Sequence, residues 1–441
     1  MEAEYSSVNE SSATMTPTFS AQPGGRDGAG RYYNLDALRA FALMAVVIGH
    51  AAMSFRSQNT WWATVDCSPS NFLVWCQFGL HSFRLELFFV IAGFFARLIL
   101  VRQGVRGFIS NRVKRILVPF LAGWIALYPL VMLVWLWGWT VSHRLDELGL
   151  PPGAQYLPVW KLCLTYMQTL PNFGMIHLWF LYQLLIIYAL VLTIRWLTGK
   201  FKITLSILAS MDGGFADLGS WPLALVSFSL WSFPCLYMMA SWTTDTPTRT
   251  LIPCLPTTLI FGLCFSVGWF LHRQQTVLNQ WKQHWTWPLG IGLFLWVLFG
   301  IFGKYDSSQL SPQQLGVTSG EMIWVHLVYM AIYATMMWGL TLGLLGLFAR
   351  LFQRQNLWVR YVADASYWIY LIHFPLVMAL QVAVSRMNQP WPIKFMFISM
   401  ATLLLAFLGY HYLVRNTFIG VQLNGRRYPR TWPWQASSER Q

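Results

Sequence analysis

Long apolar segments separated by short polar stretches make up most of the chain from residue 32 onward. A helix needs about 20 apolar residues to cross the hydrocarbon core of a bilayer. The pattern therefore predicts an all-α integral membrane protein, a bundle of about ten transmembrane helices. Their expected positions are 37–55, 72–100, 116–139, 175–197, 221–240, 255–271, 286–303, 321–349, 361–383 and 393–414.

The remaining stretches divide the chain further. The second and eighth apolar segments are long enough to tilt or to extend past the membrane. The stretch 160–170 is the weakest, and we expect it to form a re-entrant or interfacial helix. Residues 1–31 are polar, rich in Ser, Thr and Gly, and typical of a disordered segment rather than a signal peptide, so we expect the first span to remain in the membrane. The expected units are a disordered N-terminal segment at 1–31, a transmembrane domain at 32–415 and a basic cytoplasmic tail at 416–441.

Composition supports this class. Hydrophobic residues make up 56% of the chain and charged residues only 10%, against roughly 25% in soluble domains. The 25 Trp, 31 Phe and 18 Tyr residues suit aromatic belts at the two membrane surfaces.

The net charge of +14 would indicate nucleic acid binding in a soluble protein. Here most Lys and Arg residues lie in alternate loops, which is an orientation signal and places both termini in the cytoplasm. We therefore expect no nucleic acid partner. The densest basic run follows the second segment and contains Arg102, Arg106, Arg112, Lys114 and Arg115.

The six cysteines form no Cys-x-x-Cys pair and show no metal-ligand spacing with histidine. We expect neither a metal site nor a redox cofactor. Cys67 and Cys76 either form a disulfide on the outer side or remain unpaired thiols.

Arg39 and His50 lie in the first apolar segment, where a charge costs about 3 kcal/mol or more. Eleven residues make almost three helical turns, so the two side chains share a helix face about 16 Å apart. Asp36 is one turn before Arg39 and can pair with it. A neutral imidazole suits a general base or a proton relay. The alternative is a histidine hydrogen-bonded to a neighbouring helix.

The second segment contains His81, Arg84 and Glu86. Arg84 shares a helix face with His81 and can hold a carboxylate or phosphate through two hydrogen bonds. Glu86 points elsewhere, and it can neutralise Arg84, orient a histidine or pair with another helix. The alternative is a structural ion pair between the first two helices.

Arg112 and Arg115 are spaced i, i+3 at the expected cytoplasmic mouth of the third segment. Two guanidinium groups on one helix face can clamp a phosphate, and coenzyme A is a phosphate-rich cytosolic molecule. The alternative is ordinary positive-inside anchoring.

Two further polar groups lie in apolar segments. His177 begins the fourth segment beside Trp179. Ser366, Tyr370 and His373 are spaced i, i+4, i+7 and form one polar stripe on the ninth segment. Such a stripe lines a cavity or joins helices by hydrogen bonds.

Together these residues resemble the membrane-bound acyltransferase type 3 family from about 32 to 415. The family's hallmark is a basic residue followed after ten positions by histidine, here Arg39 and His50. Its second mark, Arg-x-x-Arg, is found at Arg112 and Arg115. The sequences LDALRAFA, FFVIAGFF, HLWFL and SYWIYLIHFP are also typical of the family. HSFRLELFF, HLWFL and YLIHFP are similar to the branch that contains glucans biosynthesis protein C, which is implicated in adding succinyl groups to periplasmic glucans.

The resemblance implies an O-acyltransferase of the bacterial inner membrane. Such an enzyme moves an acetyl or succinyl group from cytosolic acyl-CoA to a hydroxyl of an extracytoplasmic glycan, such as a periplasmic glucan, without a bound cofactor. Arg112 and Arg115, with Arg39, would hold the donor phosphates. His50 would act as general base or as nucleophile, and Arg84 would bind the distal carboxylate of a succinyl donor. The expected further substrate-binding or orienting residues are His81, Glu86, His177, Trp179, Tyr370 and His373.

Two other functional classes stay open from the residues alone. One is a secondary transporter for an anionic or glycan substrate, with His50 and Glu86 relaying protons. Its usual marks are inverted repeats and broken helices, which the sequence does not display clearly. The other is a non-catalytic membrane scaffold.

Overall fold

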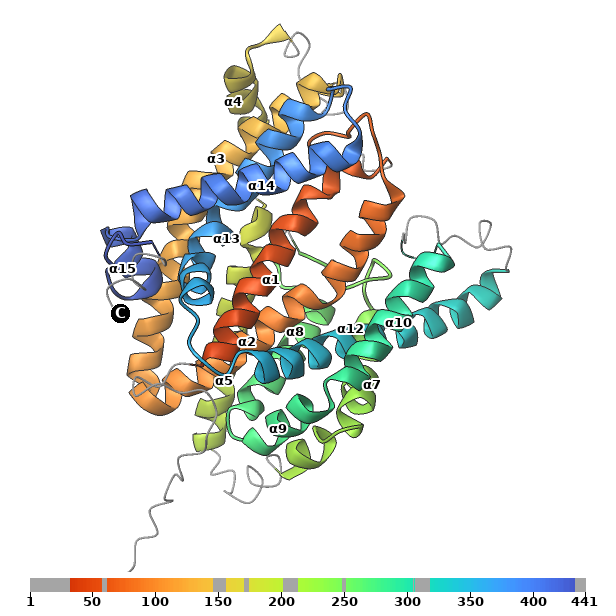
Figure 1. Cartoon of the computed structure of the whole chain (residues 1–441), viewed down its shortest axis with the longest axis vertical. Helices are drawn as coiled ribbons and strands as arrows, with labels where there is room; N and C mark the ends of the chain where they lie inside the picture. The colour runs from red at the N-terminus through yellow and green to blue at the C-terminus, as the bar shows by residue number, and fades with distance from the viewer. Residues whose placement is uncertain are drawn as a thin grey trace, which may run out of the picture.

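The computed structural model of the chain describes residues 32–57, 62–145, 156–169, 174–200, 213–247, 251–303, 305 and 318–432. Every regular element in these ranges is a helix (Figure 1). The expectation of an all-α protein is therefore confirmed.

A helix occupies each of the ten expected apolar positions. These helices are α1 (Tyr33–Ala51), α2 (Asn71–Arg112), α3 (Val118–Val141), α5 (Trp179–Lys200), α7 (Leu223–Tyr237), α8 (Leu255–Leu271), α10 (Thr286–Ile301), α12 (Ser319–Leu351), α13 (Leu357–Val384) and α14 (Trp391–Gly409). The others are α4 (Val159–Thr169), α9 (Gln275–His284), α15 (Phe418–Asn424), two 3₁₀ turns (Met53–Phe55 and Ile176–Leu178) and two π-helical turns (Val113–Leu117 and Tyr410–Val414).

The lengths of these helices set the number of candidate spans. Six helical stretches of the described residues are long and apolar enough to cross a membrane, or seven if the bent pair α8 and α9 is one span. One of the six, Asn71–Val141, runs through both α2 and α3. The helices α7 and α10, with 15 and 16 residues, are shorter than a full crossing needs. The protein is therefore a multi-pass membrane protein, and its described residues contain six to seven candidate spans rather than the ten expected.

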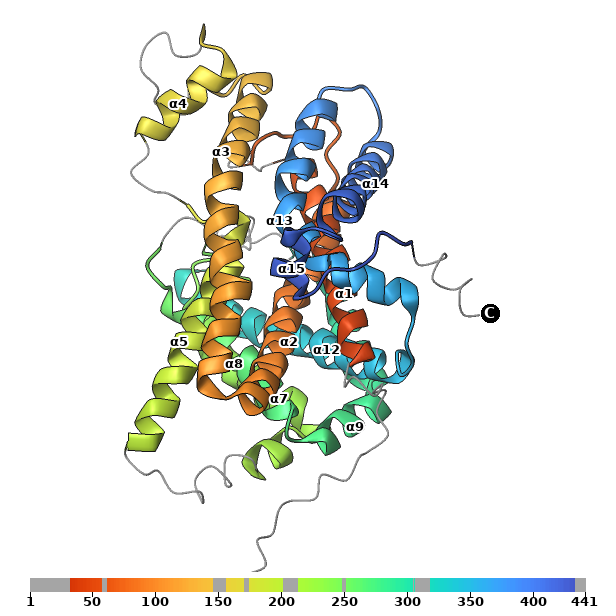
Figure 2. The ribbon, with the colours of Figure 1, turned by 90° about the vertical axis from the view of Figure 1, so that its left-hand side faces the viewer.

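The turn between α2 and α3 has a local cause. Gly104 has φ 66°, the left-handed region that favours glycine, and it interrupts the helical geometry of α2. The chain then continues through the π-helical turn Val113–Leu117 into α3. Figures 1 and 2 show the chain turning back at this corner, which carries Arg112 and Arg115.

The weak apolar stretch at 160–170 forms a helix that is too short to cross a bilayer. The helix α4 has 11 residues and packs against α3. Figure 2 shows it at one end of α3. This agrees with the expected interfacial or re-entrant helix.

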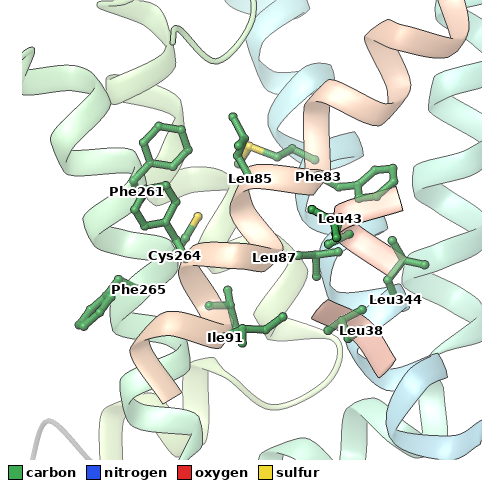
Figure 3. Packing of buried hydrophobic residues seen from close by; sticks show 14 of the residues in the cluster. Leu38, Leu43, Phe83, Leu85, Leu87, Ile91, Phe261, Cys264, Phe265 and Leu344 are labelled. Carbon is green, nitrogen blue, oxygen red and sulfur yellow. The ribbon is translucent and has the colours of Figure 1, made fainter. Parts of the chain in front are cut away.

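Helix α2 lies in the middle of the hydrophobic core. Its side chains pack on one side against α8 and on the other against α1 and α12 (Figure 3). The approach to α8 is especially close, because a Cβ atom on Gly93 would overlap the carbonyl oxygen of Phe265, and one on Gly268 would overlap that of Val90. Small residues allow such backbone contact between membrane helices.

The loop after α1 is tied to α14 by a buried ion pair. Lys394 Nζ lies 2.5 Å from Asp66 Oδ1, and both side chains are almost fully buried. Cys67 beside it is an unpaired thiol, as is Cys76. The disulfide considered for these two residues is therefore absent. Instead, the Cys67 thiol lies 3.4 Å from Lys394 Nζ and 3.4 Å from the carbonyl oxygen of Met387.

Candidate functional site: a cavity along the bundle

A cavity of about 1670 Å³ lies among α1, α2, α3, α5, α13 and the loop 240–247. Its lining residues include Ile116, in the π-helical turn just before α3, and Trp139 near the end of α3, 23 positions further on. At about 1.5 Å per residue this distance is about 35 Å, comparable with the hydrocarbon core of a bilayer. The cavity therefore extends along most of the length of the bundle.

Arg39 and His50 both line this cavity, as their spacing on one helix face predicted. Arg39 Nη2 donates a hydrogen bond to the carbonyl oxygen of Ala363 at 2.5 Å, which joins α1 to α13. It also lies 3.8 Å from Asp36 Oδ1, so the expected pairing one turn earlier is present.

His50 is hydrogen-bonded to His373 of α13. The distance from His50 Nδ1 to His373 Nε2 is 2.9 Å, and the two rings are parallel within 1°. His373 Nδ1 lies 2.7 Å from the carbonyl oxygen of Tyr370 and 3.2 Å from that of Ile369. Carbonyl oxygens only accept, so Nδ1 of His373 carries a proton. With both rings neutral, His373 Nε2 accepts from His50 Nδ1, and His50 Nε2 keeps a free lone pair.

The end of α1 is held in place by Gln381 of α13. Gln381 Nε2 donates to the carbonyl oxygens of His50 at 2.9 Å and Ala51 at 3.1 Å, which satisfies acceptors at the helix end. Trp62 Nε1 in turn donates to Gln381 Oε1 at 3.0 Å. Our sequence analysis missed Gln381, although it lies eight positions after His373 inside an apolar segment, where an amide is costly unless hydrogen-bonded.

The polar stripe of α13 faces the cavity, since Ser366, Tyr370 and His373 all line it. Tyr370 Oη donates to the carbonyl oxygen of His177 at 2.7 Å, and His177 Nε2 donates to that of Leu371 at 2.9 Å. The ring centroids of His177 and His373 are 5.4 Å apart. The stripe of α13 therefore lines the cavity and is joined to His177 by a hydrogen bond. Trp179, which follows the 3₁₀ turn Ile176–Leu178, is buried and also lines the cavity.

His81 and Arg84 share a face of α2, as predicted. Arg84 Nη2 lies 3.4 Å from His81 Nδ1, and both residues line the cavity. Glu86 is placed differently. It is fully buried, does not line the cavity, and accepts a hydrogen bond from Thr244 Oγ1 at 3.3 Å. The structure gives no support to a direct contact between Glu86 and substrate, because the residue points to the opposite side of α2 from Arg84.

Arg112 and Arg115 line the cavity at the corner between α2 and α3. Arg112 Nη1 donates to Tyr188 Oη at 3.3 Å, and its guanidinium lies 4.9 Å from the centroid of that ring. Arg115 Nη1 donates to the carbonyl oxygen of Leu423 at 3.1 Å. A π-helical turn begins at Val113, so the two residues do not follow regular i, i+3 spacing, but both reach the same cavity.

The opposite end of the cavity is rich in aromatic side chains that our sequence analysis did not single out. Trp135 and Trp139 line it from one face of α3, and Tyr128 lies two turns before Trp135. Residues of the loop 240–247 also line the cavity. The lining residues of this part include Trp62, Ser241 and Thr243. The signal in the sequence was the i, i+4 spacing of Trp135 and Trp139 within an aromatic run.

The cavity histidines are not arranged as a metal site. In the ranges that the structure describes, no group of three or more His, Cys, Asp or Glu side chains is placed to hold a metal ion. The arrangement does provide a neutral imidazole with a free nitrogen, separated from a cationic end of the same cavity.

Comparison with known proteins identifies the family. The model of the acyltransferase 3 family, described as an acyltransferase domain, matches residues 32–411. The protein belongs to the acyltransferase 3 family. This enzyme is therefore an acyltransferase, and the predicted class and family resemblance are confirmed.

Curated relatives of this acyltransferase show a more distant likeness. Glucans biosynthesis protein C of Escherichia coli (strain SMS-3-5 / SECEC) is 32% identical over 93 residues, 21% of this chain and 24% of that protein. The protein of the same name from Shigella dysenteriae serotype 1 is 29% identical over 161 residues, 36% of this chain and 37% of that protein. The alignments thus span only 24% to 37% of the length of these relatives. No solved structure matches this acyltransferase.

Proposed function

We propose that this acyltransferase moves an acetyl or succinyl group from cytosolic acyl-CoA to a hydroxyl group of an extracytoplasmic glycan. The observation that carries the proposal is the single cavity that joins the arginine corner at Arg112 and Arg115 to the His50–His373 pair. A donor bound at one end and an acceptor bound at the other can meet within it.

The arginine corner suits the phosphates of coenzyme A. Guanidinium groups bind phosphate through charge-assisted hydrogen bonds, and Arg112, Arg115 and Arg39 all line this part of the cavity. Arg39 and His50 are about 16 Å apart along α1. Coenzyme A carries its phosphates and its thioester at opposite ends of a long flexible arm, so the donor can reach from the corner to His50.

His50 supplies the base. Its Nε2 accepts the proton of the acceptor hydroxyl while the oxygen attacks the thioester carbonyl carbon. The C–S bond then breaks, the departing sulfur takes the proton from Nε2, and the products are the ester and free coenzyme A. A covalent route, in which Nε2 first takes the acyl group, uses the same nitrogen.

The aromatic end of the cavity supports a glycan acceptor. Trp and Tyr side chains offer flat apolar faces together with a polar edge, and they suit the mixed surface of a sugar ring. Trp62, Trp135 and Trp139 lie there with the hydroxyl groups of Ser241 and Thr243. The relatives are glucans biosynthesis proteins C, which makes a glucan the first acceptor to test.

The membrane arrangement completes the proposal. Both termini in the cytoplasm of a bacterial inner membrane agree with the distribution of Lys and Arg along the chain. This orientation exposes the arginine corner to cytosolic acyl-CoA. Family membership favours acyl transfer over transport or a scaffold role.

The test uses purified protein in detergent with radiolabelled acetyl-CoA or succinyl-CoA and a glucan acceptor. Wild-type protein should transfer label to the glycan, and His50→Ala should abolish transfer while the protein still folds. His284→Ala is the matched control, because this histidine is exposed and does not line the cavity. Full activity of His50→Ala would rule out the proposed role.

A further inference from the structure

Arg84 places a guanidinium group in the wall of the cavity next to the helix turn that carries His50. The residue is only 5% exposed, yet it lines the cavity. A Cβ atom on Gly49 would overlap Arg84 Nη1, so the guanidinium lies directly against the backbone of α1. Glycine is required at position 49 for this approach, and the next residue along the helix is His50.

One edge of the Arg84 guanidinium is anchored by a hydrogen-bond chain. His81 Nε2 lies 2.9 Å from the carbonyl oxygen of Thr244, which can only accept, so this nitrogen carries the proton. In the neutral ring, Nδ1 then accepts from Arg84 Nη2 at 3.4 Å. His81 therefore orients Arg84 and connects it to the loop 240–247.

The remaining donors of Arg84 have no hydrogen-bond partner. Within the described part of the chain, Nε and Nη1 are buried and unsatisfied. Among the described residues no ion pair joins Glu86 to Arg84, and the Glu86 carboxylate accepts a hydrogen bond from Thr244 Oγ1. A buried, unpaired guanidinium is costly, and donors fixed in one direction are well suited to a negative charge that arises during a reaction.

We propose that Arg84 is a catalytic residue that binds the oxyanion formed on the thioester carbonyl oxygen during acyl transfer. This inference rests on the proposed function. When the acceptor oxygen bonds to the carbonyl carbon, the C=O electron pair moves onto oxygen, and the Arg84 guanidinium in the cavity wall donates to that oxyanion. As the C–S bond breaks, the C=O bond forms again and the contact weakens.

The position of Arg84 favours this role over binding of the donor phosphates. A general base and an oxyanion donor must both reach the reacting atoms, so they must be close neighbours. Arg84 adjoins the His50 turn through Gly49, whereas Arg112 and Arg115 lie at the far corner where α2 ends.

Kinetics of Arg84→Gln and Arg84→Lys test the proposal, with Arg102→Gln as a control on the same helix at an exposed position outside the cavity. Loss of one oxyanion donor typically lowers kcat by about 10²–10³-fold. We expect a loss of that size for Arg84→Gln, a smaller one for Arg84→Lys, little change in the donor KM, and wild-type kinetics for Arg102→Gln.

Binding of an alkyl-CoA, in which a methylene replaces the thioester carbonyl, separates this role from loss of fold and from phosphate binding. Because no oxyanion can form, wild type and Arg84→Gln should bind it with equal affinity. If Arg84→Gln kept the kcat of wild type, with or without weaker binding of the alkyl-CoA, the inference about Arg84 would be overturned while the proposed function would stand. Absence of transfer by the wild-type protein would overturn both this inference and the proposed function.

Discussion

His50 Nδ1 and His373 Nε2 lie 2.9 Å apart, although 323 positions separate the two residues in the chain. The hydrogen bond joins the last turn of α1 to the middle of α13. Because the backbone carbonyl oxygens of Tyr370 and Ile369 fix the proton on His373 Nδ1, the pair directs the free lone pair to His50 Nε2.

Replacement of His373 tests this assignment. In His373→Ala the proton on His50 Nδ1 loses its acceptor, so the ring can turn or exchange tautomers. Positioned proton transfer contributes about 10²–10⁴-fold, and we expect kcat to fall within that range while the donor KM changes little. His373→Gln offers an oxygen acceptor and should retain more activity than His373→Ala. Equal kcat for His373→Ala and wild type, measured across pH, would contradict the positioning role.

The arginine corner should determine donor affinity. Each charge-assisted hydrogen bond is worth about 1.5–3 kcal/mol, so loss of one should weaken acyl-CoA binding about tenfold or more. We expect Arg112→Ala combined with Arg115→Ala to raise the KM for acyl-CoA with a smaller effect on kcat. Arg102→Ala is the control, since that residue is exposed and outside the cavity. An unchanged affinity of the double variant, measured by equilibrium binding, would reject the phosphate clamp.

The buried pair between Lys394 and Asp66 should dominate the stability of the loop that follows α1. Removing one partner leaves the other charge buried without compensation, which costs about 3–5 kcal/mol. Lys394→Met should therefore lower the thermal midpoint strongly, whereas Lys394→Met with Asp66→Leu should recover much of the loss. Thermal unfolding in detergent measures this, and equal midpoints for Lys394→Met and wild type would contradict it.

Two glycines of α8 offer a matched pair for the contact with α2. A Cβ atom on Gly268 would overlap the carbonyl oxygen of Val90, whereas one on Gly262 would meet no atom within 4 Å. Overpacking costs about 1–3 kcal/mol, so Gly268→Ala should destabilise the protein by that amount. Gly262→Ala should be neutral or up to about 1 kcal/mol more stable, because alanine favours the helix. The same thermal assay compares the two variants, and similar midpoints would show that the contact is not tight.

Hydropathy predicted a helix at each of ten positions, and the structure has a helix at each of them. Helix length was harder to predict. The apolar stretches around 221–240 and 286–303 exceed the 15 and 16 residues of α7 and α10, since turns and irregular backbone occupy their ends. Apolar composition indicates that a segment is shielded from water, whereas the length of its helix also depends on what the segment packs against.

For the site, too, the sequence predicted some features and not others. The i, i+11 spacing of Arg39 and His50 correctly predicted that the two side chains share a helix face. The polar stripe of α13 was expected to line a cavity or to join helices, and its residues do line the cavity. For Glu86, local spacing predicted that it points elsewhere than Arg84 but not which residue it contacts. It lies two positions from Arg84, which directs it away from the cavity, and its partner Thr244 lies 158 positions later in the chain. The spacing of residues within one helix cannot predict this hydrogen bond between Glu86 and Thr244.

The amino-acid sequence alone determined the membrane class, the positions of the helices and which polar residues share a helix face, because these depend on local composition and on helical periodicity. Only the tertiary structure decided that His373 accepts from His50, that Gln381 holds the end of α1, and that Arg84 keeps two buried donors without a partner. Each of these relations joins helices or loops that are distant in the chain, so it depends on how the bundle packs.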